Sequence, residues 1–259
     1  MRDFKRRTPR LFRRPLTRFR RPLRPPSADG AAVLPWRPVR RLPTFAELQA
    51  AIRGLPWDDL RYALWIPAYL ICFALLENIP LHHYWATQLP LDQFIPYCSW
   101  FFIPYSMWYF LLILTGFRVF AADRAAFRRY MRFLSVTTWI SVVFWILVPN
   151  GQDLRPASPD GVFGAAIATL YRVDTSTNVF PSLHVTGSIG AALAACDALW
   201  RRDRPYCVSV CALAFLICLS TMFIKQHSLL DVIGGAVLSW AAARRVYRRR
   251  SAVAEKESI

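Results

Sequence analysis

The chain has 259 residues, of which 55% are hydrophobic and 15% aromatic. These residues stand in long uncharged blocks, a composition that excludes an ordinary soluble domain and is typical of a polytopic membrane protein. Lys and Arg outnumber Asp and Glu by 33 to 16, but 14 of the basic residues lie in residues 1–41, so the net charge of +17 reflects a tail rather than a nucleic-acid-binding domain.

The first predicted segment, residues 1–41, is a disordered basic tail. Its like charges repel one another, and its many prolines remove backbone donors. No apolar stretch follows the first basic residues, so we do not expect a cleaved signal peptide, and we expect the tail to lie on an anionic, cytoplasmic leaflet. Thr44 and Glu47 have the spacing of a capping box, which predicts an interfacial amphipathic helix within residues 42–58.

Six transmembrane helices are predicted within residues 59–250. Four segments are long and nearly uncharged; one of them, residues 95–117, has 23 uncharged residues, enough to cross about 30 Å of hydrocarbon. Segments 185–196 and 232–243 are shorter, and we count them as spans because their flanking polar residues can face a protein interior. The predicted spans are 60–78, 95–117, 133–149, 185–196, 206–224 and 232–243. The expected fold is therefore an all-α, six-transmembrane-helix bundle, followed by a cytoplasmic tail at 251–259.

Loop charge predicts the orientation of this bundle, because cytoplasmic loops of membrane proteins carry an excess of Lys and Arg. The 118–132 and 197–205 loops and the C-terminal segment are rich in Arg, whereas the 78–94 loop has neither Lys nor Arg. We therefore expect both termini in the cytoplasm and the alternate loops outside. The absence of organelle signals, the Arg-rich composition and the compact size favour a bacterial inner membrane.

The cysteines and one histidine pair are the other candidates for a disulfide or a metal site. Six cysteines lie in or beside apolar segments without the spacing of a zinc site, so we expect small buried apolar side chains rather than a disulfide framework. The adjacent His82 and His83 point in different directions on most backbones, which disfavours a metal site.

Polar residues that suit phosphate chemistry gather on the predicted outer side. They are Arg155, Asn178, Ser182, His184, Lys225, His227 and Asp231. Cationic side chains, hydroxyls and helix N-termini suit a phosphate oxyanion. His227 and Asp231 are four residues apart on one helix face, so the carboxylate can fix the tautomer of an imidazole whose other nitrogen attacks phosphorus. His184 can then protonate the departing alkoxide.

Each of these residues also has a purely structural interpretation. An Asp–His pair at a helix end is more often structural than catalytic, Arg155 can be solvated, and Lys225 can anchor a helix end at the interface. Their convergence on one membrane face nevertheless favours a functional site, because ionisable groups are costly to bury near lipid.

Three segments resemble the signatures of the type 2 phosphatidic acid phosphatase superfamily. Residues 178–184, Asn-Val-Phe-Pro-Ser-Leu-His, look like its second signature, which usually contains Pro-Ser-Gly-His. Residues 220–231 resemble the third signature, which is Ser-Arg, five residues, His, three residues and Asp. Residues 154–156, Leu-Arg-Pro, resemble the end of the first signature, Lys, six residues and Arg-Pro.

The chain departs from these signatures at three positions. Leu183 replaces the usual Gly, Val148 stands where the first-signature Lys is expected, and Thr221 replaces the third-signature Arg. Lys225, one helical turn away from Thr221, can restore the missing cation. The Pro-Ser-Leu-His and Lys-Gln-His forms look like the branch that includes inositol phosphorylceramide synthases.

The resemblance implies a mechanism and a set of site residues. His227 is expected to be the nucleophile that forms a phosphohistidine, Asp231 to orient it, and His184 to act first as general acid and then as base. The expected phosphate-binding residues are Arg155, Lys225, Ser182 and Asn178. Neither a metal nor a cofactor is implied.

The residues therefore predict an enzyme whose partners are membrane lipids and a lipid phosphate. Our first hypothesis is a lipid phosphatase that hydrolyses phosphatidate, an isoprenyl phosphate or a related lipid; the alternative is a phosphotransferase that moves a phospho-head group to an alcohol or sphingoid lipid. A cytochrome with His184 and His227 as haem ligands leaves Asp231 without a role, and a catalytically inactive scaffold does not account for the intact His, His and Asp set. Nothing raises Asp92 or Tyr105 above chance as head-group contacts, and the sequence predicts no oligomeric state.

Overall fold

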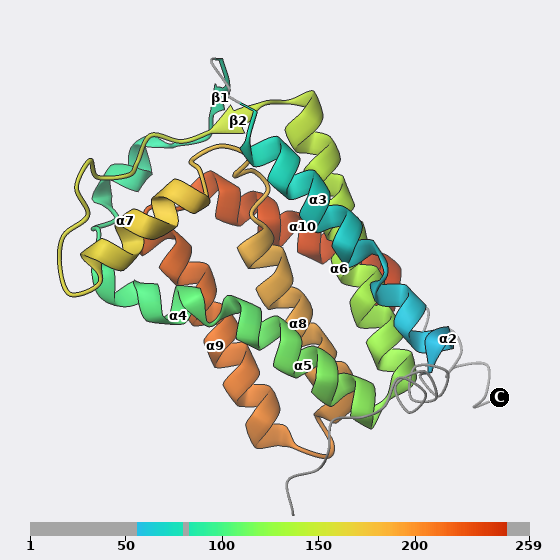
Figure 1. Ribbon diagram of the computed structural model, residues 1–259. Helices are drawn as coiled ribbons and strands as arrows, with labels where there is room; N and C mark the ends of the chain where they lie inside the picture. Colours follow the sequence, from blue (N-terminus) through green and yellow to red (C-terminus); the bar gives the residue numbers. More distant parts are fainter. Residues whose placement is uncertain (1–55, 80–82, 248–259) are drawn as a thin grey trace, which may run out of the picture. The chain divides into compact units, whose positions relative to one another are not determined.

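The computed structural model describes residues 56–79 and 83–247, whose regular structure is almost entirely helical (Figure 1). The predicted tails 1–41 and 251–259 lie outside the described residues, as does the predicted interfacial helix 42–58 except for its last three residues. The elements are α2 (Trp57–Leu60), η1 (Arg61–Ala63), α3 (Trp65–Glu77), β1 (Trp85–Ala86), η2 (Pro90–Phe94), η3 (Ser99–Phe101), α4 (Phe102–Ser106), α5 (Trp108–Ala122), α6 (Arg124–Leu147), β2 (Asn150–Gly151), α7 (Gly164–Val173), α8 (Leu183–Leu199), α9 (Arg204–Phe223) and α10 (Leu229–Tyr247).

Four helical segments within the described residues are long and apolar enough to cross a membrane. They are Trp57–Glu77, Ser99–Ala122, Arg124–Leu147 and Arg204–Phe223. These segments coincide with the first, second, third and fifth predicted spans, so the all-α class and four helices of spanning length are confirmed.

The fourth predicted span corresponds to α8, which packs against α5, α6, α9 and α10 near the middle of the bundle (Figure 1). Its glycines permit close contact: a Cβ added to Gly187 would meet Trp108 at 2.9 Å, and one added to Gly190 would meet Phe133 at 2.8 Å. Gly, Ala, Ser and Thr supply nine of the 17 residues of α8, and this apolar helix is shorter than the four long ones. The assignment of α8 and α10 as membrane spans stays a prediction.

Polar caps set the ends of the helices on the Arg-rich side. The side chain of Asp123 accepts hydrogen bonds from the first turn of α6, and that of Asp203 accepts one from the first turn of α9. Asp203 also forms an ion pair with Arg118 of α5. Asp123 directly follows the end of α5 and Asp203 lies four residues after the end of α8, so both N-caps begin the next helix after a short connection.

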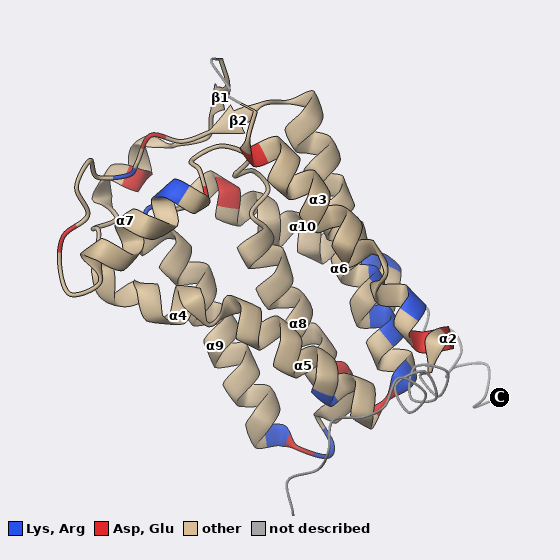
Figure 2. Ribbon diagram, viewed as in Figure 1, with Lys and Arg blue, Asp and Glu red and all other residues tan. Residues whose placement is uncertain are grey.

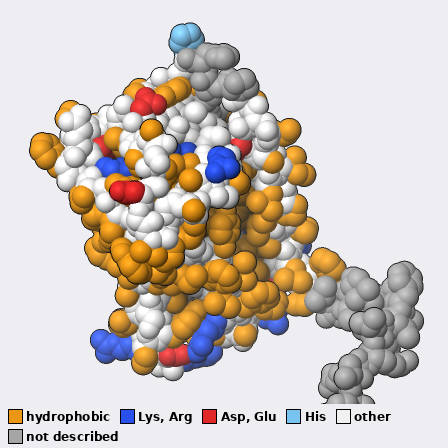
Figure 3. All heavy atoms as spheres, turned by 60° about the vertical axis from the view of Figure 1, so that its left-hand side comes forward, with side chains coloured by type: hydrophobic (Ala, Val, Ile, Leu, Met, Phe, Trp, Pro, Cys, Tyr) orange, Lys and Arg blue, Asp and Glu red, His pale blue; other side chains and the backbone are white. Residues whose placement is uncertain are grey.

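Basic residues gather at one end of the bundle, around the α5–α6 and α8–α9 connections and the end of α10 (Figure 2). Asp59 pairs there with Arg128 at 2.6 Å, and Asp197 pairs with Arg129 at 2.6 Å. Between the two ends, a broad belt of hydrophobic side chains covers the face seen in Figure 3. Exposed apolar residues on this scale are expected where lipid replaces water. The long apolar helices and this belt are those of a membrane protein.

At the other end, three connections meet above the helices. The first joins α3 to α4, the second joins α6 to α7, and the third joins α7 to α8. β1 pairs in parallel with β2, with Trp85 opposite Asn150, and Gly151 forms an antiparallel bridge with Thr177. The third connection then leads directly into α8. Tyr84 and the exposed His83 lie in the first connection, while His82 lies outside the described residues, so the predicted absence of a metal site at the histidine pair stays a prediction.

Gly235 of α10 lets this third connection lie directly on the helix, and we expect Gly235→Ala to destabilise the protein. An added Cβ would be 2.9 Å from the backbone oxygen of Ser182 and 2.9 Å from Val185 Cβ. Such overpacking typically costs about 1–3 kcal/mol. The measurement is the thermal unfolding midpoint in detergent. Gly116→Ala on α5 is the matched control, because its nearest contact would be an ordinary 3.8 Å from Tyr130 and the midpoint should not fall.

Candidate active site

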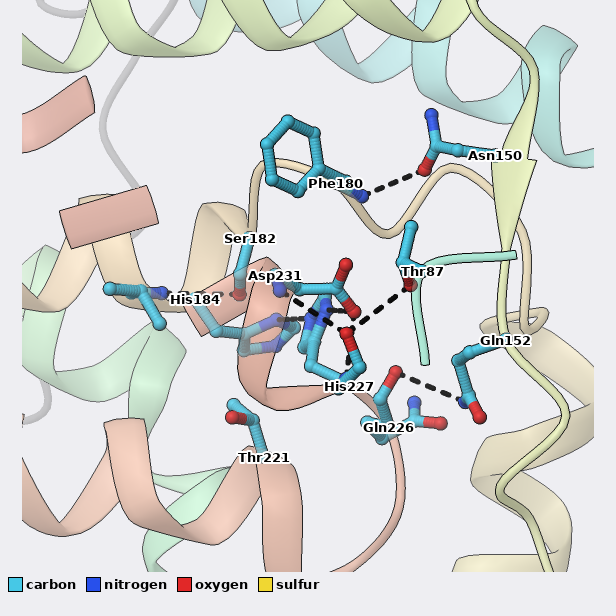
Figure 4. A network of polar contacts seen from close by, with 12 residues as sticks. Thr87, Asn150, Gln152, Phe180, Ser182, His184, Thr221, Gln226, His227 and Asp231 are labelled. Carbon is cyan, nitrogen blue, oxygen red and sulfur yellow. Dashed lines mark hydrogen bonds and ion pairs between the residues drawn. The ribbon is translucent and has the colours of Figure 1, made fainter. Parts of the chain in front are cut away.

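His184 and His227 face each other at the end of the bundle opposite the arginines. His184 lies in the first turn of α8, and His227 lies in the connection between α9 and α10. His227 Nε2 is 3.4 Å from His184 Nδ1, and Figure 4 shows the two rings turned toward one another. Residues 43 positions apart in the chain thus present one ring nitrogen each to the same point. Two imidazoles in this arrangement can serve as nucleophile and proton donor to one substrate.

Two aromatic rings fix the position of His184. Tyr105 of α4 stacks on its ring with centroids 4.5 Å apart and an interplanar angle of 27°. Trp108 of α5 packs against the same ring at 4.4 Å. Both aromatic side chains are buried, so the imidazole has little freedom to rotate away from His227. The second predicted span therefore contributes directly to the site.

Asp231 lies on the other side of His227. Its Oδ2 atom is 3.6 Å from His227 Nδ1, within ion-pair range but longer than a hydrogen bond. The same oxygen accepts a 2.7 Å hydrogen bond from the backbone N–H of Ser228, while the Ser228 hydroxyl accepts one from the Asp231 N–H. This reciprocal pair is a capping box at the start of α10. Asp231 thus has a structural task as well as a position beside the histidine.

Asn150 and Gln152 hold the neighbouring connections in place (Figure 4). Asn150 Oδ1 accepts a 2.8 Å hydrogen bond from Phe180 N, and its Nδ2 donates to the carbonyl of Val148. Gln152 Nε2 donates 2.9 Å to the carbonyl of Lys225. Both amides are fully buried. They join the segment after α6 to the segments that carry His184 and His227.

Ser182 and Asn178 shape the approach to α8. The Ser182 hydroxyl accepts a hydrogen bond from Val185 N as the N-cap, and its backbone N–H donates 3.2 Å to the carbonyl of Asp231. Asn178 has φ of 56°, a left-handed conformation that asparagine tolerates better than most residues. Its backbone N–H donates to the carbonyl of Asn150. Their predicted role in phosphate binding stays a prediction.

Lys225 adopts the left-handed conformation, with φ of 55°, and reaches back to the 90–98 segment. Its ammonium donates to the carbonyls of Asp92, at 3.0 Å, and Ile95. Burial lowers the pKa of this ammonium, and the carboxylate of Asp92 opposes that shift. An ammonium has three donors, and these two bonds leave one of them for a further acceptor. The predicted phosphate contact of Lys225 stays a prediction.

Arg155 is held by backbone carbonyls of the connection after α7. Its guanidinium donates to the carbonyls of Tyr171, Asp174 and Thr175 and lies over the Tyr171 ring, 4.5 Å from the centroid. Burial lowers the pKa of Arg155, and the carboxylate of Asp174 opposes this shift. Its Nε has no hydrogen-bond partner among the described residues. Its predicted role in phosphate binding stays a prediction.

The model of the PAP2 superfamily matches residues 68–254, more than half of the chain. The chain belongs to the PAP2 superfamily. Members of this superfamily are phosphoric ester hydrolases or phosphotransferases that act on lipid phosphates in membranes. Comparisons with curated proteins and with solved structures gave no match. The resemblance to the inositol phosphorylceramide synthase branch therefore stays an expectation.

Asp92 is a buried carboxylate beside the candidate site that the sequence did not single out. It is 1% exposed, and its two carboxylate oxygens accept 2.7 Å hydrogen bonds from the backbone N–H groups of Leu229 and Leu89. It therefore ties the first connection to the start of α10. In the sequence, Asp92 is a single carboxylate two residues after Pro90, and nothing around it distinguishes a buried hydrogen-bonding residue from a solvated loop residue.

Tyr105, Gln226 and Asp174 form a second polar cluster beside the histidines. Asp174 Oδ2 accepts hydrogen bonds of 2.9 Å from Tyr105 OH and from Gln226 Nε2. Gln226 precedes His227, and Tyr105 stacks on His184, so one carboxylate positions a neighbour of each histidine. The buried Gln226 Oε1, His227 Nδ1 and Asp231 Oδ1 have no hydrogen-bond partner within the described ranges. Buried polar atoms without partners are rare in proteins, and their gathering here is consistent with a catalytic role or with a bound ligand or water.

Proposed function

We propose that this protein is a lipid phosphate phosphatase that works through a phosphohistidine. The observation that carries the proposal is the His184–His227 pair, whose facing nitrogens are 3.4 Å apart beside the buried carboxylate of Asp231. A nucleophile, a proton donor and an orienting anion are the groups that cleavage of an unactivated phosphate ester needs. A haem between the histidines is not favoured, because Tyr105 and Trp108 pack against the His184 ring.

In the first proposed step, His227 Nε2 attacks phosphorus. The P–O bond to the lipid breaks, and His184 gives its proton to the departing alkoxide. The carboxylate of Asp231, 3.6 Å from His227 Nδ1, stabilises the positive charge that develops on the imidazole.

In the second proposed step, His184 takes a proton from water, whose oxygen attacks the phosphohistidine. The P–N bond breaks and releases phosphate with His227 restored. The chain uses its own ionisable groups throughout, and we propose that no metal takes part.

We also propose six membrane spans, with α8 and α10 as the fourth and sixth, and with the active site facing outward. The gathering of arginines at the other end of the bundle supports a cytoplasmic position for that end (Figure 2). In a bacterial inner membrane, a reporter inserted near Asp160 should be periplasmic and a reporter after Arg250 cytoplasmic. The reverse pattern would place the histidines on the cytoplasmic side.

Hydrolysis is distinguished from transfer by supplying a radiolabelled lipid phosphate in oxygen-18 water, with and without a lipid alcohol. Hydrolysis should place oxygen-18 in released phosphate at a rate that does not depend on the alcohol and that is unchanged by EDTA. Label that appears mainly in a new lipid would replace our proposal with a phosphotransferase. Loss of activity in EDTA, restored by magnesium, would contradict the metal-independent mechanism.

Lys225 is the proposed replacement for the arginine that the third signature has at Thr221. We expect Lys225→Met to reduce kcat/KM by an amount corresponding to about 2–4 kcal/mol, the usual effect of removing one oxyanion donor. Lys225→Arg should retain most of the activity, because it keeps the cation at the same backbone position. Steady-state kinetics check both variants.

Arg155→Lys separates a structural role from phosphate binding at Arg155. Lysine keeps the charge but cannot donate to three carbonyls in the planar geometry of a guanidinium. A lower unfolding midpoint with kcat/KM nearly unchanged would assign Arg155 to the fold alone. We expect both quantities to fall.

A further inference from the structure

Asp174 is the residue at which contacts from the surroundings of both histidines meet. It directly follows α7, and its Oδ2 atom accepts hydrogen bonds of 2.9 Å from Tyr105 OH and from Gln226 Nε2. A third hydrogen bond, of 3.2 Å, runs from Gln226 Nε2 to Tyr105 OH. Side chains from α4, from the connection before α8 and from the connection before α10 thus form one closed set of hydrogen bonds, in which a change at one member is felt by the others.

The bond from Tyr105 leads to His184. The phenol ring stacks on the imidazole with centroids 4.5 Å apart, and Tyr105 is only 5% exposed. Stacking fixes the separation of two rings better than their offset, because an offset pair has no directional bond between its members. The hydroxyl at the far end of the phenol supplies that direction through its bond to Asp174. The carboxylate therefore limits how far His184 can shift.

The bond from Gln226 leads to His227 through the backbone. Gln226 is 2% exposed and directly precedes His227. The backbone N–H groups of both residues donate to the carbonyl of Thr221, at 2.9 Å and 3.1 Å. The side-chain bond to Asp174 holds the same backbone from a different direction. The point from which the His227 imidazole projects is therefore fixed by two sets of contacts.

Asp174 is itself held by its neighbours. Arg155 Nη2 donates to the carbonyl of Asp174 at 2.8 Å and to that of Thr175 at 2.7 Å. The backbone N–H of Thr175 donates 2.9 Å to Glu77 Oε2 at the end of α3. The carboxylate of Asp174 thus starts from a backbone that is clamped on two sides. Arg155 can act on the histidines through this clamp without touching a substrate.

We infer that Asp174 is a positioning residue that aligns the two histidines, and that its two hydrogen bonds serve different parts of the reaction. This inference rests on the proposed function. The bond from Tyr105 aligns His184 for proton transfer to the departing alkoxide, and the bond from Gln226 aligns the His227 nitrogen for attack on phosphorus. Both tasks need an acceptor oxygen at this place rather than a negative charge.

The two bonds are separated by the rate of phosphoenzyme formation from an alkyl phosphate and from an aryl phosphate, whose leaving group needs no proton. Tyr105→Phe keeps the stacked ring but loses its bond to Asp174. It should slow the alkyl ester by about ten- to a hundredfold, the effect of a small misplacement, and leave the aryl ester nearly unchanged. Equal slowing of the two esters would overturn the link between this bond and proton transfer.

Gln226→Met gives the opposite pattern. Methionine fills a similar volume without the amide, so the backbone before His227 loses its bond to Asp174. Attack on phosphorus is common to both esters, and both should therefore be slowed by the same factor. A variant that slows only the alkyl ester would contradict the assignment of this bond to the nucleophile.

Asp174→Ala and Asp174→Asn distinguish position from charge. The alanine variant should combine both defects. The asparagine variant should retain most of the wild-type rates, because one amide oxygen can accept both hydrogen bonds. Equal losses in the two variants would show that the charge is what matters, and the positioning role would be wrong.

Tyr84→Phe is the matched control. Tyr84 OH also donates to a carboxylate, that of Asp153 at 2.6 Å, among the connections at the same end of the bundle. The aromatic neighbours of the His184 ring among the described residues are Tyr105, Trp108 and His227, so Tyr84 is not one of them. Both phosphorylation rates should match those of the wild type. A loss specific to the alkyl ester in this control would remove the special place of Tyr105.

A last measurement does not depend on turnover. In detergent-solubilised protein with carbon-13-labelled histidine, the ring current of the stacked Tyr105 should displace the ring C–H signal of His184, which is assigned by its loss in His184→Ala. Asp174→Ala should move this signal toward that of an unstacked histidine, and Asp174→Asn should not. An unmoved signal in Asp174→Ala would overturn the positioning role even if activity fell. A moved signal in a protein that cleaves no phosphate ester would leave the alignment standing and reject the proposed function alone.

Discussion

His227→Ala should abolish turnover of lipid phosphates. His227 Nε2, which lies 3.4 Å from His184 Nδ1, is the proposed nucleophile, and alanine has no side-chain atom that can form a bond to phosphorus. Removing the nucleophile of a hydrolase that acts through a covalent intermediate costs roughly a millionfold in kcat. The measurement is phosphate release by purified protein, together with acid-quenched trapping of the labelled phosphoenzyme.

His184→Ala is the informative partner of this variant. It should still form the phosphoenzyme from an aryl phosphate, whose leaving group needs no proton, and then release phosphate slowly because water lacks its base. His227→Ala should form no phosphoenzyme from either kind of ester. A phosphoenzyme in His227→Ala, or appreciable turnover by a folded sample, would remove His227 from the role of nucleophile.

The four long helices could be predicted because a helix that faces lipid must carry apolar side chains along most of its length. Leu114 and Phe215, on two of the four long helices, are 61% and 64% exposed, so their segments must be apolar almost throughout. α8 is apolar as well, but it is shorter than these four helices. Its Gly187 and Gly190 face Trp108 and Phe133 rather than lipid, because a helix covered by other helices needs small side chains where its neighbours approach closely.

The spacing of the site could be predicted where it is local in sequence. His227 and Asp231 are four residues apart, and their side chains approach to 3.6 Å, although His227 lies in the connection before α10 and the two do not share a helix face as the sequence predicted. The stacking of Tyr105 on His184 could not be predicted, because it joins residues 79 positions apart through the packing of α4 and α5 on α8. Local patterns specify neighbours along a helix but not across helices.

The contacts of Arg155 and Lys225 show a second limit of prediction from the sequence. Both were selected as cations suited to phosphate, and in the structure both donate to backbone carbonyls of long connections. Any segment that leaves a helix has carbonyls without partners, and these carbonyls can accept hydrogen bonds from nearby cations, as phosphate oxygens can. Charge alone therefore cannot separate a loop clamp from a ligand contact.

Asp231→Asn should reduce kcat by about 10⁴, the cost known for the equivalent change in a hydrolase triad. Asparagine has the same shape and can still accept the hydrogen bond from Ser228 N, so the start of α10 should remain capped. What it lacks is the negative charge 3.6 Å from His227 Nδ1 that stabilises the imidazolium. Kinetics and the unfolding midpoint are measured on the same sample.

Ser228→Ala separates the charge from the cap. It removes the hydroxyl that accepts from Asp231 N and leaves the Asp231 carboxylate in place. The loss of half of the capping box should cost about 1 kcal/mol of stability. Its effect on kcat should be small, because the anion beside His227 is retained. If instead Ser228→Ala and Asp231→Asn lose activity and stability in the same proportion, Asp231 acts through the helix cap and not through its charge, and the orienting role in the proposed mechanism is wrong.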